Sequence, residues 1–308
     1  MIPFLHLGPL TIPTFGLMVA CAILAAFFVL RADLERRGLA GSDEKTRPSA
    51  SRKSANAEAE LLIAIPCMVG LAGAKLYHLL ESPAEFFAHP LALLISPFGF
   101  AWFGGLLAGF AAFVWVGRRQ HIPLLTLLDV GSPAAALGYG IGRIGCFLSG
   151  DGDYGIPTSL PWGMSFPNGL VPTTDRVHPT PIYELIVACV IAWFLWRMGQ
   201  MQILRGAFER VSPEARAAGR TVRVPISDHA FYRASPEGVT ALSRWLRSGS
   251  VFAAYLVLTG VARFLVEFIR INPRSFLGMS NAQTGSLVST IAGFALWLWL
   301  ANRREQRT

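Results

Sequence analysis

Long apolar stretches separated by polar connections run through the whole chain. A helix needs about 20 mostly apolar residues to cross a bilayer. Stretches that meet or approach this length lie near residues 15–32, 60–80, 98–117, 123–148, 181–198, 250–270 and 283–302. The segment before the first stretch holds Pro3, Pro9 and Pro13, so it is a poor regular helix. The pattern predicts an all-α fold, a polytopic membrane helix bundle with about seven transmembrane helices.

Composition supports a membrane protein. Of the 308 residues, 53% are hydrophobic and 15% are charged, whereas soluble domains carry about 25% charged residues. The net charge of +8 does not indicate nucleic-acid binding, because the basic residues lie between apolar stretches rather than in one patch. The four cysteines lie in or beside apolar stretches, without the spacing of a disulfide framework or a metal site. We therefore expect no metal and no nucleic-acid partner.

Basic residues alternate between the two sides of the predicted membrane. One set of connections, with the C-terminal end, carries 21 lysines and arginines, whereas the opposite set carries only Arg176, Arg270 and Arg274. Cytoplasmic loops are enriched in Lys and Arg, so the N-terminus is predicted outside and the C-terminus in the cytoplasm. An odd number of spans agrees with this orientation.

The polar segments define the expected organisation of a single membrane domain, residues 1–308. Residues 33–57 are predicted to be a cytoplasmic polar linker, and residues 149–180, rich in Gly, Pro, Asp and Thr, a periplasmic loop region. Residues 199–249 form a cytoplasmic insertion. Its two Ser-Pro-Glu segments each begin like a capped helix, although a partly ordered insertion fits equally well.

Three basic residues fall inside the predicted spans: Lys75, Arg143 and Arg263. A charge at the bilayer centre costs about 2.5–3.5 kcal/mol on insertion scales, so each needs a partner or a function. Arg143 lies in the sequence GYGIGRIGCFLSGDGDYG, where Gly142 and Gly145 remove side-chain bulk beside it. Another helix or a lipid headgroup can therefore approach Arg143 closely.

Arg263 opens a second charged group. Glu267 and Arg270 follow four and seven residues later, so helical spacing places all three on one face. One interpretation is an ion pair that fixes helix packing, and the other is an anion site whose arginine is held by a carboxylate. Arg143 is predicted at a similar depth on another helix, which favours the anion site. Guanidinium groups bind phosphate with paired donors.

Weaker signals surround these two groups. Lys75 is either a third cation of the site or a residue that pairs with Glu81 or Glu184, and Glu184 itself is placed to compensate a cation at its depth. Gly104 and Gly105 favour close helix contact. The G-x-G-x-x-G pattern at 140–145 lacks a preceding strand, so it does not indicate a dinucleotide site.

These motifs, in this order, resemble the prolipoprotein diacylglyceryl transferase family. The resemblance is carried by LGPLTIPTFGLM, GAKLYHLL, GFAWFGGLLAG, GRIGCFLSGD, HPTPIYE, GVARFLVEFIR and SNAQTGSLVS. It implies a multi-pass enzyme of the bacterial inner membrane that performs the first step of lipoprotein maturation. Such enzymes move the diacylglyceryl group of phosphatidylglycerol onto the lipobox cysteine of a prolipoprotein signal peptide, and glycerol-1-phosphate leaves. They use no metal and no organic cofactor.

The resemblance also implies roles for residues. Arg143 matches the family's signature arginine and Arg263 the arginine of its sixth-span motif, so both are the expected catalytic residues that hold the phosphate. Together with the charge pattern, the expected substrate-binding set is Arg143, Gly142, Gly145, Gly104, Gly105, Lys75, Asp151, Glu184, Glu267 and Arg270.

The chain departs from the family pattern at the thiol base. Some members carry histidine before the Gly-Gly pair, where this chain has Phe103, which cannot accept a proton. Asp151, Asp153, His178 and the lipid phosphate are the alternatives for this role. A paralogue that binds lipid or lipoprotein after losing its chemistry is therefore the second hypothesis. An anion transporter is the third, because intramembrane arginines also mark permeation paths.

Overall fold

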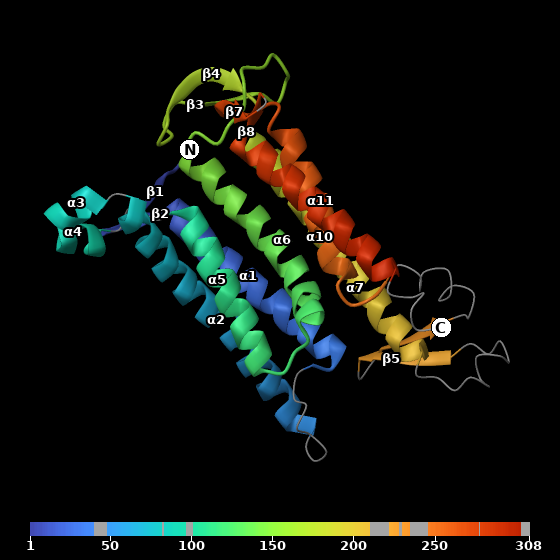
Figure 1. The fold of residues 1–308 in the computed structure, drawn as a ribbon. Helices are drawn as coiled ribbons and strands as arrows, with labels where there is room; N and C mark the ends of the chain where they lie inside the picture. The colour runs from blue at the N-terminus through green and yellow to red at the C-terminus, as the bar shows by residue number, and fades with distance from the viewer. Residues whose placement is uncertain are drawn as a thin grey trace. The chain divides into compact units, whose positions relative to one another are not determined.

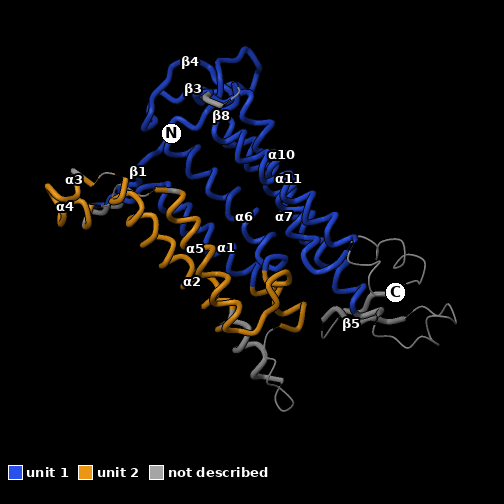
Figure 2. The backbone as a smooth tube through the Cα atoms, in the orientation of Figure 1, with its two compact units in different colours: residues 1–30, 128–308 blue, residues 31–127 orange. Residues whose placement is uncertain are grey.

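The computed structural model describes residues 1–39, 48–81, 83–96, 101–209, 222–227, 230–234, 246–276 and 278–302. These residues divide into two compact units, which are considered separately below (Figure 2). The first unit joins Met1–Leu30 to Leu128–Thr308, and the second is Arg31–Leu127.

Each of the seven predicted stretches overlaps one helix. These helices are α1 (Thr14–Arg37), α2 (Pro48–Glu81), α5 (Trp102–Arg119), α6 (Leu124–Ser149), α7 (Thr180–Glu209), α10 (Ser250–Val266) and α11 (Asn281–Asn302) (Figure 1). Two short helices, α3 (Pro83–Ala88) and α4 (Pro90–Ile95), follow α2. The mostly helical prediction is confirmed.

Beside the helices, the described residues form four two-stranded antiparallel hairpins, which the sequence pattern did not predict. They pair β1 (Phe4–Leu7) with β2 (Leu10–Pro13), β3 (Met164–Phe166) with β4 (Thr173–Val177), β5 (Val222–Ser227) with β6 (Ala230–Ala234), and β7 (Arg274–Phe276) with β8 (Met279–Ser280). Gly8 and Gly278 supply positive φ angles of 62° and 72° at two of the turns. The proline-rich start is therefore a hairpin rather than a helix.

Five helices of the described part of the chain are long and apolar enough to cross a membrane: α1, Ala59–Glu81 of α2, α6, Thr180–Gly206 of α7, and α11. The apolar helix α10 has only 17 residues, because it ends at Val266 rather than at the predicted residue 270. Large apolar side chains are exposed along these helices, among them Leu80 at 70% and Trp193 at 64%. Such exposure fits helices whose surroundings are lipid.

Two predicted polar segments contain more regular structure than expected. Helix α1 continues to Arg37 and α2 begins at Pro48, so both ends of the 33–57 linker are helical. In the 199–249 insertion, α7 continues to Glu209 and the β5–β6 hairpin follows. The Ser-Pro-Glu segments at 212–220 and 235–245 lie outside the described residues.

Within the first unit, α10 and α11 lie side by side and approach closely at two glycines (Figure 1). A Cβ atom on Gly260 would lie 2.4 Å from the Thr290 hydroxyl oxygen, and one on Gly293 would lie 2.8 Å from the Ala253 carbonyl oxygen. Real Cβ atoms do not approach this closely, so only glycine fits. The glycines therefore set how near the two helices lie, and hence where α10 presents Arg263.

The start of α10 is fixed by a buried carboxylate of α6. Asp129, whose surface is fully buried, accepts the backbone N–H groups of Gly249 at 2.7 Å and Phe252 at 2.8 Å. Gln202 of α7 donates to the same carboxylate at 2.9 Å. A negative group at a helix N-terminus satisfies otherwise unpaired N–H groups and opposes the helix dipole. Asp129 thus ties α6, α7 and α10 together.

Within the second unit, α2 and α5 pack through glycines, as the Gly104-Gly105 pair predicts. A Cβ atom on Gly104 would lie 2.4 Å from the Gly73 carbonyl oxygen, and one on Gly105 would lie 3.4 Å from that of Gly70. Lys75 of α2 is buried, and its Nζ donates to the Ser96 carbonyl oxygen at 2.9 Å.

Candidate functional site

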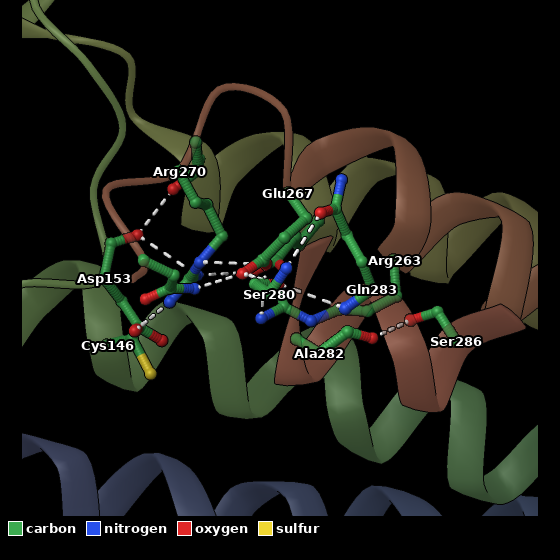
Figure 3. Close-up of polar contacts among 12 residues, drawn as sticks. Cys146, Asp153, Arg263, Glu267, Arg270, Ser280, Ala282, Gln283 and Ser286 are labelled. Carbon is green, nitrogen blue, oxygen red and sulfur yellow. Dashed lines mark hydrogen bonds and ion pairs between the residues drawn. The ribbon is translucent and has the colours of Figure 1, made fainter. Parts of the chain in front are cut away.

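Three arginines and three carboxylates meet in the first unit, at one end of helices α6, α7 and α10. The helices supply Arg143, Glu184 and Arg263. The segments that follow α6 and α10 supply Asp153, Glu267 and Arg270, which Figure 3 shows beside Arg263. The six formal charges cancel. We call these six residues the arginine–carboxylate cluster.

Glu184 is the centre of this cluster. Its Oε1 pairs with Nη1 of Arg263 at 2.9 Å, and its Oε2 pairs with Nε of Arg143 at 3.0 Å. The Tyr139 hydroxyl donates to Oε1 at 3.1 Å. The Glu184 side chain is only 4% exposed, so these ion pairs are shielded from water. One carboxylate therefore holds two arginines of separate helices beside each other.

Arg143 makes further contacts on the other side of its guanidinium group. Its Nη1 pairs with Oδ2 of Asp153 and lies 3.7 Å from Sγ of Cys146. The guanidinium carbon lies 4.8 Å from the centre of the Tyr139 ring, a cation–π distance. A Cβ on Gly142, which precedes Arg143, would meet no atom within 4 Å apart from its neighbours in α6, so this turn of the helix is open at Gly142. Gly145 instead packs against Phe15 of α1, at 3.1 Å from such a Cβ.

Asp153 links Arg143 to Arg270, because its Oδ1 pairs with Nη2 of Arg270 (Figure 3). Burial raises the pKa of the Asp153 carboxyl, but the charges and hydrogen bonds of Arg270 and Arg143 outweigh burial and hold it below the ordinary value. Two residues earlier, burial and the Asp153 charge raise the pKa of Asp151. Neighbouring carboxyls on one loop thus differ in proton affinity.

Glu267 holds Arg263 from the other side, with Oε2 at 2.8 Å from Nη2. Its Oε1 accepts hydrogen bonds from Asn272 and, at 2.8 Å, from the Ser280 hydroxyl. Ser280 and Gln283 form a reciprocal capping box at the start of α11, with bonds of 3.0 and 3.1 Å. The first turn of α11 therefore helps to orient Glu267, and through it Arg263 (Figure 3).

The structure brings together Arg143, Glu184, Arg263, Glu267 and Arg270, all predicted from the sequence. Asp151 lies on the same loop as Asp153, where its Oδ1 accepts the Asp153 backbone N–H at 3.2 Å. Three other predicted residues, Lys75, Gly104 and Gly105, belong to the second unit, where the two glycines lie in the α2–α5 contact described above.

Sequence reasoning missed three residues that contact the cluster, Tyr139, Asn272 and Ser280, and also Gln283, which holds Ser280 in place. Tyr139 precedes Arg143 by one helical turn, so the spacing of α6 contained a signal for it. Asn272, Ser280 and Gln283 are uncharged and gave no charge signal, although Ser280 and Gln283 lie in the motif SNAQTGSLVS. Asp153 appeared only as a possible base, not as an ion-pair partner of the arginines.

Three side chains near the end of α6 carry atoms that can bind a metal ion. These atoms of Cys146, Asp151 and Asp153 lie within 4.8 Å of one another. Both oxygens of Asp153, however, already face guanidinium groups. A metal cation there would be repelled by Arg143 and Arg270. The charges around this loop therefore argue against a metal ion at Asp153.

Comparison with known proteins decides the family. A family model described as "Prolipoprotein diacylglyceryl transferase" matches residues 3–212 and 231–299, most of the chain. The chain belongs to the prolipoprotein diacylglyceryl transferase family. All six residues of the arginine–carboxylate cluster fall in the matched ranges, and the unmatched residues 213–230 fall in the 199–249 segment.

Curated relatives named phosphatidylglycerol–prolipoprotein diacylglyceryl transferase agree with this family assignment. The protein of Geobacter sulfurreducens is 30% identical over 278 residues, 90% of this chain and 84% of the relative. That of Clostridium tetani is 29% identical, covering 91% of this chain and 89% of the relative. That of Paracidovorax citrulli is 29% identical, covering 98% and 96%. The resemblance to prolipoprotein diacylglyceryl transferases drawn from the motifs is confirmed.

Proposed function

We propose that this protein transfers the diacylglyceryl group of phosphatidylglycerol to the lipobox cysteine of prolipoproteins and releases glycerol-1-phosphate. One observation carries the proposal within the family: Arg143 and Arg263, from separate helices, share the buried carboxylate of Glu184. Two fixed guanidinium groups at one point are what a departing phosphate ester requires.

In the proposed reaction the thiolate sulfur attacks the glyceryl carbon that carries the phosphate ester. The carbon–sulfur bond forms, the carbon–oxygen bond breaks, and negative charge accumulates on the phosphate. Arg143 and Arg263 stabilise that charge, and preorganised charge of this kind is often the largest catalytic contribution. Glu184 and Glu267 hold the guanidinium groups in place, so little reorganisation is needed. Arg270 offers a third cation to the headgroup.

The proposed lipid-binding role extends to the surroundings of Arg143. The open space at Gly142 supports an approach of the headgroup to the turn of α6 that carries Arg143. Gly145, Gly104 and Gly105 have a packing contact that is reason enough for a glycine. Their part in substrate binding, like that of Lys75, therefore rests on the sequence alone.

We further propose seven spans in the bacterial inner membrane, with the N-terminus outside and the C-terminus in the cytoplasm. The charge asymmetry of the connections supports this orientation. It places residues 149–180 and the arginine–carboxylate cluster toward the periplasm, where secreted prolipoproteins arrive. Residues 33–57 and 199–249 then lie on the cytoplasmic side.

The direct test is transfer of a labelled glyceryl group from phosphatidylglycerol to a lipobox peptide by the purified protein. Wild type is expected to transfer the label, and Arg143→Ala to lose at least two orders of magnitude in rate while still inserting in the membrane, because a single oxyanion-stabilising donor contributes about 10²–10³ in kcat. Transfer at the normal rate by Arg143→Ala would refute the site.

A catalytically impaired paralogue that binds lipid or lipoprotein is the second candidate. Phe103, at the position of a histidine in some family members, favours it. Complementation of bacteria depleted of their own transferase separates the two. Growth supports the enzyme, and failure to grow despite normal expression supports the binding protein.

A further inference from the structure

Asp153 pairs with two of the three arginines of the cluster. Its Oδ2 faces Nη1 of Arg143 and its Oδ1 faces Nη2 of Arg270, so each oxygen of one carboxylate is held by a different guanidinium group. Arginine binds phosphate oxygens through the same donors that it offers to carboxylates. A lipid phosphate that reaches these two arginines must therefore compete with Asp153.

The carboxylates of the cluster differ in how firmly they are held. The side chains of Glu184 and Glu267 are 4% and 1% exposed, and each also accepts a hydroxyl hydrogen bond. The Asp153 side chain is 29% exposed. Within the described residues, its carboxylate is hydrogen-bonded to the two guanidinium groups alone. Asp153 is thus the carboxylate that an incoming anion displaces most easily.

The main chain at Asp153 is held firmly. Its carbonyl oxygen accepts the Thr180 hydroxyl, and the N–H of Gly155 donates to the His178 carbonyl oxygen at 2.8 Å. The Tyr154 side chain is buried in a small apolar cluster. Displacement therefore means rotation of the Asp153 side chain, and the released carboxylate stays beside the phosphate-binding position.

We propose that Asp153 holds the place of the lipid phosphate in the free enzyme and, once displaced, accepts the proton of the lipobox thiol. This inference rests on the proposed transferase function and fills the role that Phe103 cannot perform. The phosphate of the bound lipid replaces Asp153 as the partner of Arg143 and Arg270. The carboxylate of Asp153 then has no salt bridge and can act as a base. The thiol is then ionised only when lipid is bound.

Electrostatics supports this order of events. In the free protein Arg270 and Arg143 outweigh burial and keep the pKa of Asp153 low, which makes it a weak base. The other charged or titratable groups that face it are Asp151, Cys146 and, through Arg270, Glu184. Phosphate neutralises the two arginines, whereas burial and the Asp151 charge remain. Both of these favour the protonated form.

The proposed step balances. The thiol proton moves to an Asp153 carboxylate oxygen, and the thiolate forms the carbon–sulfur bond as the carbon–oxygen bond breaks. The electron pair of that bond leaves with the phosphate oxygen, so a phosphodiester monoanion becomes a phosphomonoester dianion. The proton on Asp153 passes to that dianion or to water. The carboxylate then returns to Arg143 and Arg270 as glycerol-1-phosphate departs.

Displacement is tested by binding of phosphatidylglycerol to purified wild type, Asp153→Asn and Asp175→Asn in detergent micelles of fixed composition. The Asp153→Asn variant is expected to bind several-fold more tightly, because a neutral amide competes less well for the guanidinium groups. Asp175→Asn, the same change on strand β4 outside the cluster, is expected to bind as wild type does. Unchanged or weaker binding by Asp153→Asn would overturn the displacement.

The base is tested by transfer to a lipobox peptide between pH 6.5 and 9. Because general-base catalysis contributes about 10²–10⁴, kcat of Asp153→Asn is expected to fall by that factor at pH 7 while KM for the lipid falls rather than rises. The loss should shrink toward pH 9, because a free cysteine thiol ionises near pH 8.5. Asp153→Glu, which keeps a carboxylate, should retain more activity than Asp153→Asn.

The outcomes separate the two proposals. The role of Asp153 as the base would be refuted if the loss of kcat in Asp153→Asn were the same at every pH, or if kcat were normal. Wild-type protein that binds phosphatidylglycerol but transfers nothing would refute the transferase function and the base with it. Tighter lipid binding by Asp153→Asn would still support the displacement in that case.

Discussion

Three arginines and three carboxylates in contact explain how single charged residues are tolerated at the end of apolar helices. Each isolated charge would cost about 2.5–3.5 kcal/mol at the bilayer centre on insertion scales. Glu184 compensates Arg143 and Arg263 at once, and Glu267 adds a second partner for Arg263. Pairing stabilises the charges and also aims the guanidinium groups. The two interpretations of the Arg263 motif, ion pair and anion site, are therefore compatible.

Glu184→Gln tests this shared carboxylate. The amide keeps the shape and one acceptor oxygen but leaves two half-buried arginines with less counter-charge. Since breaking a buried ion pair costs about 3–5 kcal/mol, the thermal unfolding midpoint in detergent should fall clearly. The transfer rate should fall at least ten-fold, with Asp175→Asn as the unaffected control. A Glu184→Gln protein with normal stability and activity would contradict the central role of Glu184.

Stability should depend on pH through the two loop carboxyls with opposite signs. The pKa of Asp153 is lowered, so its contribution is complete above the unfolded value of about 3.9 and is lost as pH falls through the folded value. The pKa of Asp151 is raised, so its charge reduces stability as pH rises above about 3.9.

At pH 7 we therefore expect Asp151→Asn to raise the unfolding midpoint and Asp153→Asn to lower it. The Asp151→Asn difference should disappear toward pH 3, where Asp151 is mostly protonated in both states, and the Asp153→Asn difference should begin to shrink only below about pH 3.9, where the unfolded state takes up its proton. Thermal unfolding from pH 3 to 7 measures this. Equal shifts of both variants at every pH would show that packing, not charge, is responsible.

The sequence predicted five members of the cluster, but it predicted an individual ion pair only where local spacing reveals it. Glu267 lies one helical turn from Arg263, so the sequence alone predicts their pairing. Asp153 and Arg270 are 117 residues apart, and both lie outside regular helices. No periodic pattern connects such positions. Their contact depends on how the loop after α6 folds back onto the end of α10.

At the scale of elements, α10 is positioned at both ends by different means. Asp129 caps its first turn from α6, and close contact at Gly260 and Gly293 holds it against α11. Gly260 precedes Arg263 by one turn. A shift of the helix at Gly260 therefore moves an arginine of the cluster.

Gly260→Ala tests this contact, with Gly285→Ala as its matched control. A Cβ on Gly260 would lie 2.8 Å from the Ser286 carbonyl oxygen, a backbone atom, whereas a Cβ on Gly285 of α11 would meet nothing within 4 Å. Gly260→Ala should destabilise the protein by about 1–3 kcal/mol, the usual cost of overpacking, and slow transfer. Gly285→Ala should be neutral or stabilising, since alanine favours helix. The opposite order in detergent unfolding would contradict the account.

Elements were predictable in proportion to their length. The seven helices follow apolar stretches of about 20 residues, whose signal is strong. The hairpins have strands of two to six residues, too short for alternation to be recognised beside so many apolar residues. Helix ends were also missed, because α2 begins within a polar, Ser- and Lys-containing sequence at Pro48.

At the scale of the whole molecule, orientation in the membrane follows from charge rather than from the fold. Five helices qualify as spans by length and composition in the described part of the chain, and α10 is shorter. The proposed seven-span arrangement therefore depends on the basic residues between helices. Helix α7 is the useful test, because the segments at its two sides carry opposite assignments: residues 149–180 outside, residues 199–249 inside.

The orientation can be tested with two variants that each carry one introduced cysteine. Asp175 precedes α7 and Ser248 precedes α10, and both are exposed. In a background with the four native cysteines replaced, Asp175→Cys should react with a membrane-impermeant maleimide added to intact spheroplasts, because it faces the periplasm. Ser248→Cys should react only after the membrane is permeabilised. Labelling of Ser248→Cys in intact spheroplasts, with Asp175→Cys protected, would invert the topology. It would also place the arginine–carboxylate cluster on the side away from secreted prolipoproteins, and the proposed reaction would then lose its substrate.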